Sequence, residues 1–222
     1  MIDPKVKTAI EAALQAFSKY NTFDAKPFIS VFEDVFSSDE DFLTKAGMLD
    51  EVFDEYPQME SLREVFFDLL MINFFSADIK KLEEDYLDSP EWEEIEEETL
   101  DRGTELLNLL LYLNECADED IEPGLDDYLK EFLLVDEDEF QDEYSIYEPV
   151  IENQILIESP VAEISKVASK LPEDSELKEL FYPMMCFFQN TSPSAEARNK
   201  IAGSSQNKDF DMAVLEIMIS FK

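Results

Sequence analysis

The sequence predicts an all-α protein. Its 222 residues include only four glycines, and no Asn-Gly or Asp-Gly pair is present to form a tight β-hairpin. Apolar residues recur every three or four positions, which is the helical period. Prolines follow Asp3, Ser89, Ser159 and Ser192, and an oxygen-bearing side chain before a proline is typical of a helix start. We expect a single-domain bundle of about eight to eleven helices.

Apolar stripes place these helices along the chain, over residues 28–36, 48–53, 59–70, 125–133 and 212–219. Residues 106–113 differ, because six leucines leave almost no polar face. A helix that is apolar all round is buried, so we expect this Leu-rich helix in the middle of the bundle. The only segment with a strand-like pattern is Ile155–Ile157, which predicts at most one short strand.

Residues 1–222 are expected to form one domain, with 204–207 as a linker to a C-terminal helix. No apolar run reaches the ~20 residues that a membrane span needs, and residues 1–17 contain no signal-peptide core. Cys116 and Cys186 both lie in apolar helical stretches. Two such thiols fit a reduced core better than a disulfide framework. We therefore predict a cytoplasmic protein that does not enter a membrane.

Negative charge is concentrated in one part of the chain. Residues 82–165 hold 30 acidic side chains and only two basic ones, Arg102 and Lys130, for a formal charge of −28 out of −37 in total. Concentrated charge of one sign is typical of a surface that meets an oppositely charged partner. Direct nucleic-acid binding is not expected, because contacts with phosphates require basic side chains.

The absence of histidine excludes several chemistries. Ser-His-Asp and Cys-His nucleophile systems need an imidazole base, and histidine-containing zinc sites need it as a ligand. Four glycines also leave no glycine-rich phosphate loop. We therefore assign no catalytic residue and no cofactor, and we predict that the protein is not an enzyme.

Carboxylates that share a hard cation remain the one catalytic alternative. Glu93, Glu94 and Glu97 form a Glu-Glu-x-x-Glu pattern, and Glu115 and Asp118 follow as Glu-x-x-Asp. This pattern, over about 26 residues, resembles the metal site of all-α nucleoside triphosphate pyrophosphohydrolases of the MazG type. The resemblance implies Mg²⁺ held between two helices. The other interpretation is a solvated acidic face, and we assign no metal ligand.

The candidate partner-binding residues combine acids with an aromatic side chain. Trp92, the only tryptophan, lies among glutamates, where arginine from a partner can stack on the indole. The alternative is that Trp92 simply packs onto the core. Residues 136–143 form the densest acidic block. The predicted set is Trp92, Glu93, Glu96, Asp136, Glu137, Asp138, Glu139, Asp142 and Glu143.

Three functional hypotheses follow. The first is an acidic helical interaction module that binds a basic protein, as an inhibitor, an immunity-type protein, a nucleic-acid mimic or a dedicated chaperone. The second is the Mg²⁺-dependent pyrophosphohydrolase. The third is a protein without a partner, whose acidic surface serves solvation in a salt-rich environment. The first depends on whether the acidic flanks 83–101 and 118–152 form one continuous surface.

Overall fold

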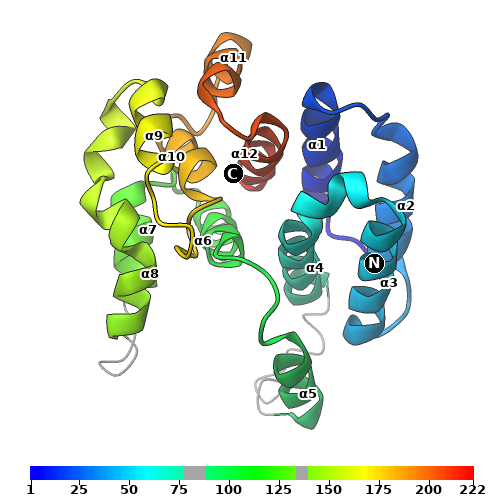
Figure 1. The fold of residues 1–222 in the computed structure, drawn as a ribbon. Coiled ribbons are helices and arrows are strands. Elements are labelled where there is room, and N and C mark those ends of the chain that lie inside the picture. Colours follow the sequence, from blue (N-terminus) through cyan, green and yellow to red (C-terminus); the bar gives the residue numbers. More distant parts are fainter. Residues whose placement is uncertain (78–88, 134–139) are drawn as a thin grey trace.

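The computed structural model describes residues 1–77, 89–133 and 140–222 (Figure 1). These residues form twelve α-helices and two 3₁₀ helices, η1 and η2, and they contain no strand. The predicted all-α class is therefore confirmed, with one α-helix more than the upper end of the expected range.

The helices are distributed over both halves of the chain. The first half of the chain contains α1 (Pro4–Tyr20), α2 (Lys26–Ser37), α3 (Phe42–Glu55), η1 (Pro57–Leu62), α4 (Arg63–Ala77), α5 (Pro90–Thr99) and α6 (Leu106–Asp118). The second half contains α7 (Leu125–Phe132), α8 (Phe140–Glu152), η2 (Gln154–Glu158), α9 (Val161–Ala168), α10 (Phe181–Gln189), α11 (Ala195–Ser204) and α12 (Lys208–Phe221).

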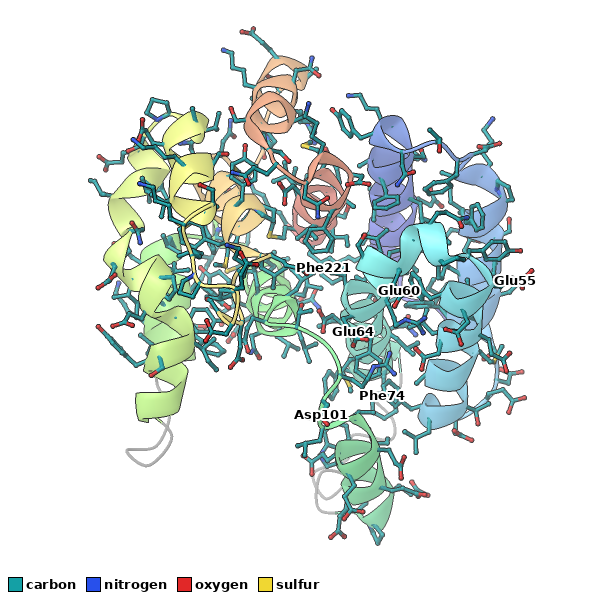
Figure 2. The ribbon with its side chains drawn as sticks, in the orientation of Figure 1. Glu55, Glu60, Glu64, Phe74, Asp101 and Phe221 are labelled. Carbon is teal, nitrogen blue, oxygen red and sulfur yellow. The ribbon has the colours of Figure 1, made fainter. Side chains whose placement is uncertain are left out.

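Helix α12 lies at the centre of the bundle (Figure 1). It separates a group formed by α1–α4 from a group formed by α7–α10, and its contact with α1 is the most extensive between any two helices. Nine of its 14 residues are buried. Phe221, at its end, is fully buried between the two groups (Figure 2). The last helix of the chain therefore organises the core.

The Leu-rich helix, α6, is less central than predicted. It packs against α4, α12 and α7, and one face is buried, including Leu106, Leu109, Leu110 and Leu113. Leu111 on the other face is 40% exposed. The expectation of a helix buried all round is therefore wrong for α6, because only one side of it meets other helices.

Two of the four predicted helix starts are confirmed. Asp3 caps α1 by accepting hydrogen bonds from two amides of the first turn, and Ser89 caps α5 by accepting one from the Trp92 amide. The other two are displaced. Ser159 ends η2, and α9 begins two residues later. Helix α11 is capped by Ser194 rather than Ser192, because the chain enters the helix only after the proline that lies between them.

The segment predicted as a short strand is helical. Residues 154–158 form η2, in which the Leu156 amide donates to Asn153 and the Ser159 amide donates to Leu156. These i→i+3 bonds satisfy the backbone locally. Ile155 is 67% exposed and Leu156 is buried. Helical and strand periods cannot be told apart over three apolar residues, which explains the difference.

Residues 205–207 join α11 to α12, and this short connection is held to the second helix. Ser205 is buried, and its hydroxyl donates to the carboxylate of Asp211 on α12 at 2.6 Å. Cys116 and Cys186 are free and buried. Within the described ranges, no helix combines the length and the apolar character that crossing a bilayer requires.

Candidate functional site

Helix α5 lies at one end of the molecule, below α4 and beside the start of the connection to α6 (Figure 1). Ile95 is its only buried residue. Half-buried Trp92 meets two phenylalanines of α4: its ring lies 6.3 Å from Phe74, nearly parallel, and 5.7 Å from Phe75. Figure 2 shows Phe74 at the end of α4 that faces α5. Aromatic packing therefore fixes how α5 sits on the bundle.

An open groove of about 550 Å³ runs along α5. Its walls are contributed by α4, α5, the connection after α5, and the first turn of α6. The apolar lining residues are Met71, Phe75, Trp92, Ile95, Leu100 and Leu107. Leu100 is 84% exposed, although burying a leucine is favourable by about 1.5–3 kcal/mol. Phe75, Trp92 and Leu107 beside it are partly exposed, so Leu100 belongs to a contiguous apolar patch, and such patches mark contact surfaces.

The groove has a negatively charged rim. Glu93, Glu96 and Glu97 line it, and α5 carries six glutamates and no basic residue. All six are exposed, and none of them forms an ion pair with another residue in the described part of the chain. Exposed carboxylates around an apolar groove attract Lys and Arg side chains and repel acidic ones.

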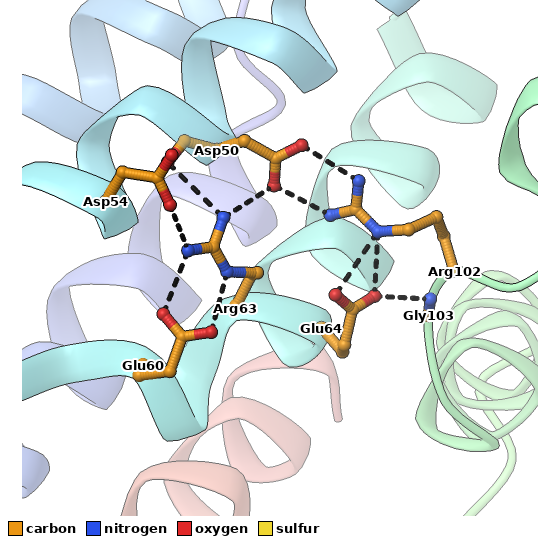
Figure 3. A network of polar contacts seen from close by, with 7 residues as sticks. All are labelled: Asp50, Asp54, Glu60, Arg63, Glu64, Arg102 and Gly103. Carbon is orange, nitrogen blue, oxygen red and sulfur yellow. Dashed lines mark hydrogen bonds and ion pairs between the residues drawn. The ribbon is translucent and has the colours of Figure 1, made fainter. Parts of the chain in front are cut away.

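The connection from α5 to α6 is held in place by Arg102 (Figure 3). Its guanidinium donates to both carboxylate oxygens of Asp50, each at 3.0 Å, and to Glu64 at 3.1 Å. It also lies 4.6 Å from the centre of the Phe67 ring. Burial lowers the pKa of Arg102, but the hydrogen bonds with Glu64 and Asp50 outweigh this effect and raise it. Arg102 is thus a structural ion-pair residue.

Asp50 joins this connection to a second arginine. Arg63 donates to Asp50 at 3.0 Å, to Asp54 at 2.6 Å and to Glu60 at 2.9 Å (Figure 3). One carboxylate on α3 therefore bridges two guanidinium groups, one from α4 and one from the connection. Bidentate pairs of this kind fix geometry as well as charge. They therefore hold the connection after α5, which carries Leu100, against α3 and α4.

A buried carboxyl group also anchors the connection. Asp68 on α4 is fully buried and accepts hydrogen bonds from the amide of Thr104 at 2.9 Å and from its hydroxyl at 2.6 Å. Burial raises the pKa of Asp68 well above its ordinary value, although the bonds from Thr104 lower it. Gly103 precedes Thr104 with φ = 83°. The backbone thus turns directly above Asp68.

The predicted partner-binding residues fall into two parts. Trp92, Glu93 and Glu96 all line the groove on α5. Asp136, Glu137, Asp138 and Glu139 lie outside the described residues, and Asp142 and Glu143 belong to the first turns of α8. In Figure 1, α5 and α8 stand well apart. The described residues of the two parts therefore lie on two separate helices and do not share the groove.

The carboxylates of the pyrophosphohydrolase-like pattern do not form a cluster. Glu93, Glu94 and Glu97 lie on α5, near the first turn of α6, whereas Glu115 and Asp118 lie in its last turn. At a rise of 1.5 Å per residue, that is roughly 12–16 Å beyond Leu107. Among residues 1–77, 89–133 and 140–222, no group of three or more acidic or thiol side chains is placed to hold a metal ion.

Leu100 is the main residue of the groove that was not predicted from the sequence. It is the only large apolar residue between Ile95 and Leu106, and an isolated apolar residue at the end of an acidic helix was the available signal. Met71 and Phe75 could not be assigned to the groove, because they belong to an apolar run that also supplies the core.

Comparisons with protein-family models, with curated proteins and with solved structures find no match to the chain.

Proposed function

We propose that the protein is an interaction module that binds a basic protein partner through the groove on α5. The observation that carries the proposal is an exposed apolar side chain, Leu100, beside exposed carboxylates on the rim of the same groove. A few well-packed side chains, with tryptophan enriched among them, supply most of the affinity of protein interfaces, while complementary charge accelerates association and selects the partner. Trp92, Glu93 and Glu96 are the residues that we propose to contact the partner.

The proposal extends to the residues that form the second acidic block, 136–139, 142 and 143, as a separate contact of the same partner. Their sequence alone supports it. We also propose that the protein acts in the cytoplasm, and the two free, buried thiols support a reducing compartment.

Charge reversal tests the proposal. Glu93→Lys with Glu96→Lys should abolish capture of a basic protein at about 50 mM NaCl, and about 500 mM NaCl should abolish capture by the wild-type protein, because salt screens exposed charges. The control is Asp174→Lys with Glu176→Lys, which changes the net charge equally on exposed residues away from α5. Capture that is the same for both double variants would contradict the role of α5.

A triple variant, Asp136→Lys, Asp138→Lys and Glu139→Lys, tests the second block in the same assay. Weaker capture is expected if both acidic regions bind the partner. No described observation favours the pyrophosphohydrolase alternative, so Mg²⁺ and a panel of nucleoside triphosphates should yield no pyrophosphate. Release of pyrophosphate above background would restore that alternative.

A further inference from the structure

The groove on α5 has the length of a short helical contact. Two of its lining residues, Trp92 in the first turn of α5 and Leu100 directly after the last residue of α5, are eight residues apart. That separation corresponds to about 12 Å, or a little more than two helical turns. Two turns of a partner helix present apolar side chains at positions i, i+4 and i+7, which span about 10 Å. The apolar lining and this spacing therefore match.

The glutamates of the rim also follow the helical period. Glu93 and Glu97 are one turn apart on α5, with Glu96 between them, and all three are exposed. Side chains at this spacing project from one face of a helix. Basic side chains at i and i+4 on a partner helix would meet these carboxylates while its apolar face covers Leu100.

We infer that the groove binds a basic amphipathic helix of a partner protein, with apolar side chains against Trp92, Leu100 and Leu107 and with Lys or Arg opposite Glu93, Glu96 and Glu97. This inference rests on the proposed function and specifies its partner. A helix is favoured over an extended peptide because the described residues offer no strand to which a peptide could add. A second copy of the chain is disfavoured, because both copies would carry a net charge of −37.

Trp92 provides the measurement, because it is the only tryptophan and it lines the groove. The probe is a tryptophan-free peptide of about 14 residues, in which Leu and Lys follow the helical period. An isomer of the same composition, in which Leu and Lys alternate, serves as the comparison. We expect the helical peptide to change Trp92 emission saturably, to gain helical circular dichroism on binding, and to bind about ten times more tightly than the isomer.

Leu100→Ser should weaken binding of the helical peptide about tenfold through lost apolar contact. Leu100 is 84% exposed, so the variant should still fold. Ile155→Ser is the matched control, because Ile155 is another exposed aliphatic residue and lies on η2. It should leave the affinity unchanged.

Three other outcomes would overturn the inference in distinguishable ways. In the first, both peptides bind equally, Glu93→Lys with Glu96→Lys lowers the affinity for both, and Leu100→Ser lowers the affinity for neither. The site then recognises basic charge without a helix, and the proposed function stands. If the alternating isomer binds more tightly, the occupant is extended. If neither peptide binds and charge reversal changes no capture of a basic protein, the inference and the proposed function both fail.

Discussion

Gly103 has a backbone conformation that other residues rarely adopt, with φ = 83°. A Cβ atom at this position would lie 2.6 Å from the Asp68 carboxylate. Gly103→Ala should therefore lower the free energy of unfolding by about 1–3 kcal/mol, through backbone strain and displacement of Asp68 from Thr104. Urea denaturation measures the loss.

The matched control for this substitution is Gly47→Ala. Gly47 lies within α3, and a Cβ atom there would meet nothing within 4 Å. Alanine stabilises a helix interior by about 0.5–1 kcal/mol relative to glycine. The same substitution should thus change the free energy of unfolding in opposite directions at the two positions. Destabilisation at both would show that the turn above Asp68 is not the cause.

Asp211 is a buried carboxyl group whose ionisation should make stability depend on pH. It is 5% exposed and accepts a hydrogen bond from Ser205 at 2.6 Å. Burial raises its pKa from 3.8 to about 6. Because the folded-state pKa exceeds the unfolded one, the protonated form favours folding, and this contribution is lost as the pH rises through about 6. Asp211→Asn should therefore be more stable than the wild-type protein at pH 7, by up to about 3 kcal/mol.

Melting temperatures of Asp211→Asn and wild type, measured from pH 4 to pH 8, check this sign. The difference should be small near pH 4, should grow up to about pH 6 as the wild-type side chain ionises, and should level off above it. Asp174→Asn is the control, because Asp174 is exposed. A constant difference across the range would assign the effect of Asp211→Asn to packing rather than to ionisation.

At the scale of elements, the connection between α5 and α6 depends on Arg102. Its guanidinium forms ion pairs with Asp50 and Glu64, and the side chain is 23% exposed. Arg102→Ala should lower the free energy of unfolding by about 2 kcal/mol, because the two carboxylates lose their shared partner. Arg102→Lys keeps the charge but not the bidentate geometry, so it should restore only part of the loss in urea denaturation.

Lys130→Ala provides the contrast for Arg102→Ala. Lys130 pairs with Asp127, and both side chains are largely exposed, so the pair should contribute only about 0–0.5 kcal/mol. An equal cost for the two alanine variants would mean that the ion pairs of Arg102 do not anchor the connection.

Local patterns predicted much of the helical structure, because caps and apolar stripes act within a few residues. The Asp3 and Ser89 caps follow directly from side-chain chemistry. The central position of α12 could not be predicted from these local patterns. Its buried face depends on α1 and α10, which come from distant parts of the chain, and periodicity indicates which face is apolar without indicating how many neighbours cover it.

The candidate site was predictable in its charge but not in its shape. Trp92 and the glutamates around it are visible in the sequence. The groove also needs Phe75 from α4 and Leu107 from α6, and no local period brings these residues together. The contact between Arg102 and Asp50 likewise joins positions 52 residues apart. The anchoring of the connection beside the groove therefore depends on tertiary contacts that local patterns do not predict.

At the scale of the whole molecule, the net charge of −37 should make folding depend on ionic strength. The screening length falls from about 30 Å at 0.01 M salt to about 3 Å at 1 M, so added salt weakens repulsion among the acids. We expect the melting temperature to rise by several degrees between about 0.02 and 0.3 M NaCl and then to level off, since repulsion between neighbouring charges is largely screened by then.

The shape of this salt dependence separates the interaction module from the solvation hypothesis. A protein adapted to a salt-rich environment would carry acids over all its surfaces, whereas residues 166–222 hold eight acidic and seven basic side chains. Screening alone therefore predicts that the melting temperature reaches a plateau at a salt concentration well below 1 M, and that KCl and NaCl have the same effect. A melting temperature that continues to rise into molar KCl would favour solvation, and the acids on α5 would then need no partner to account for them.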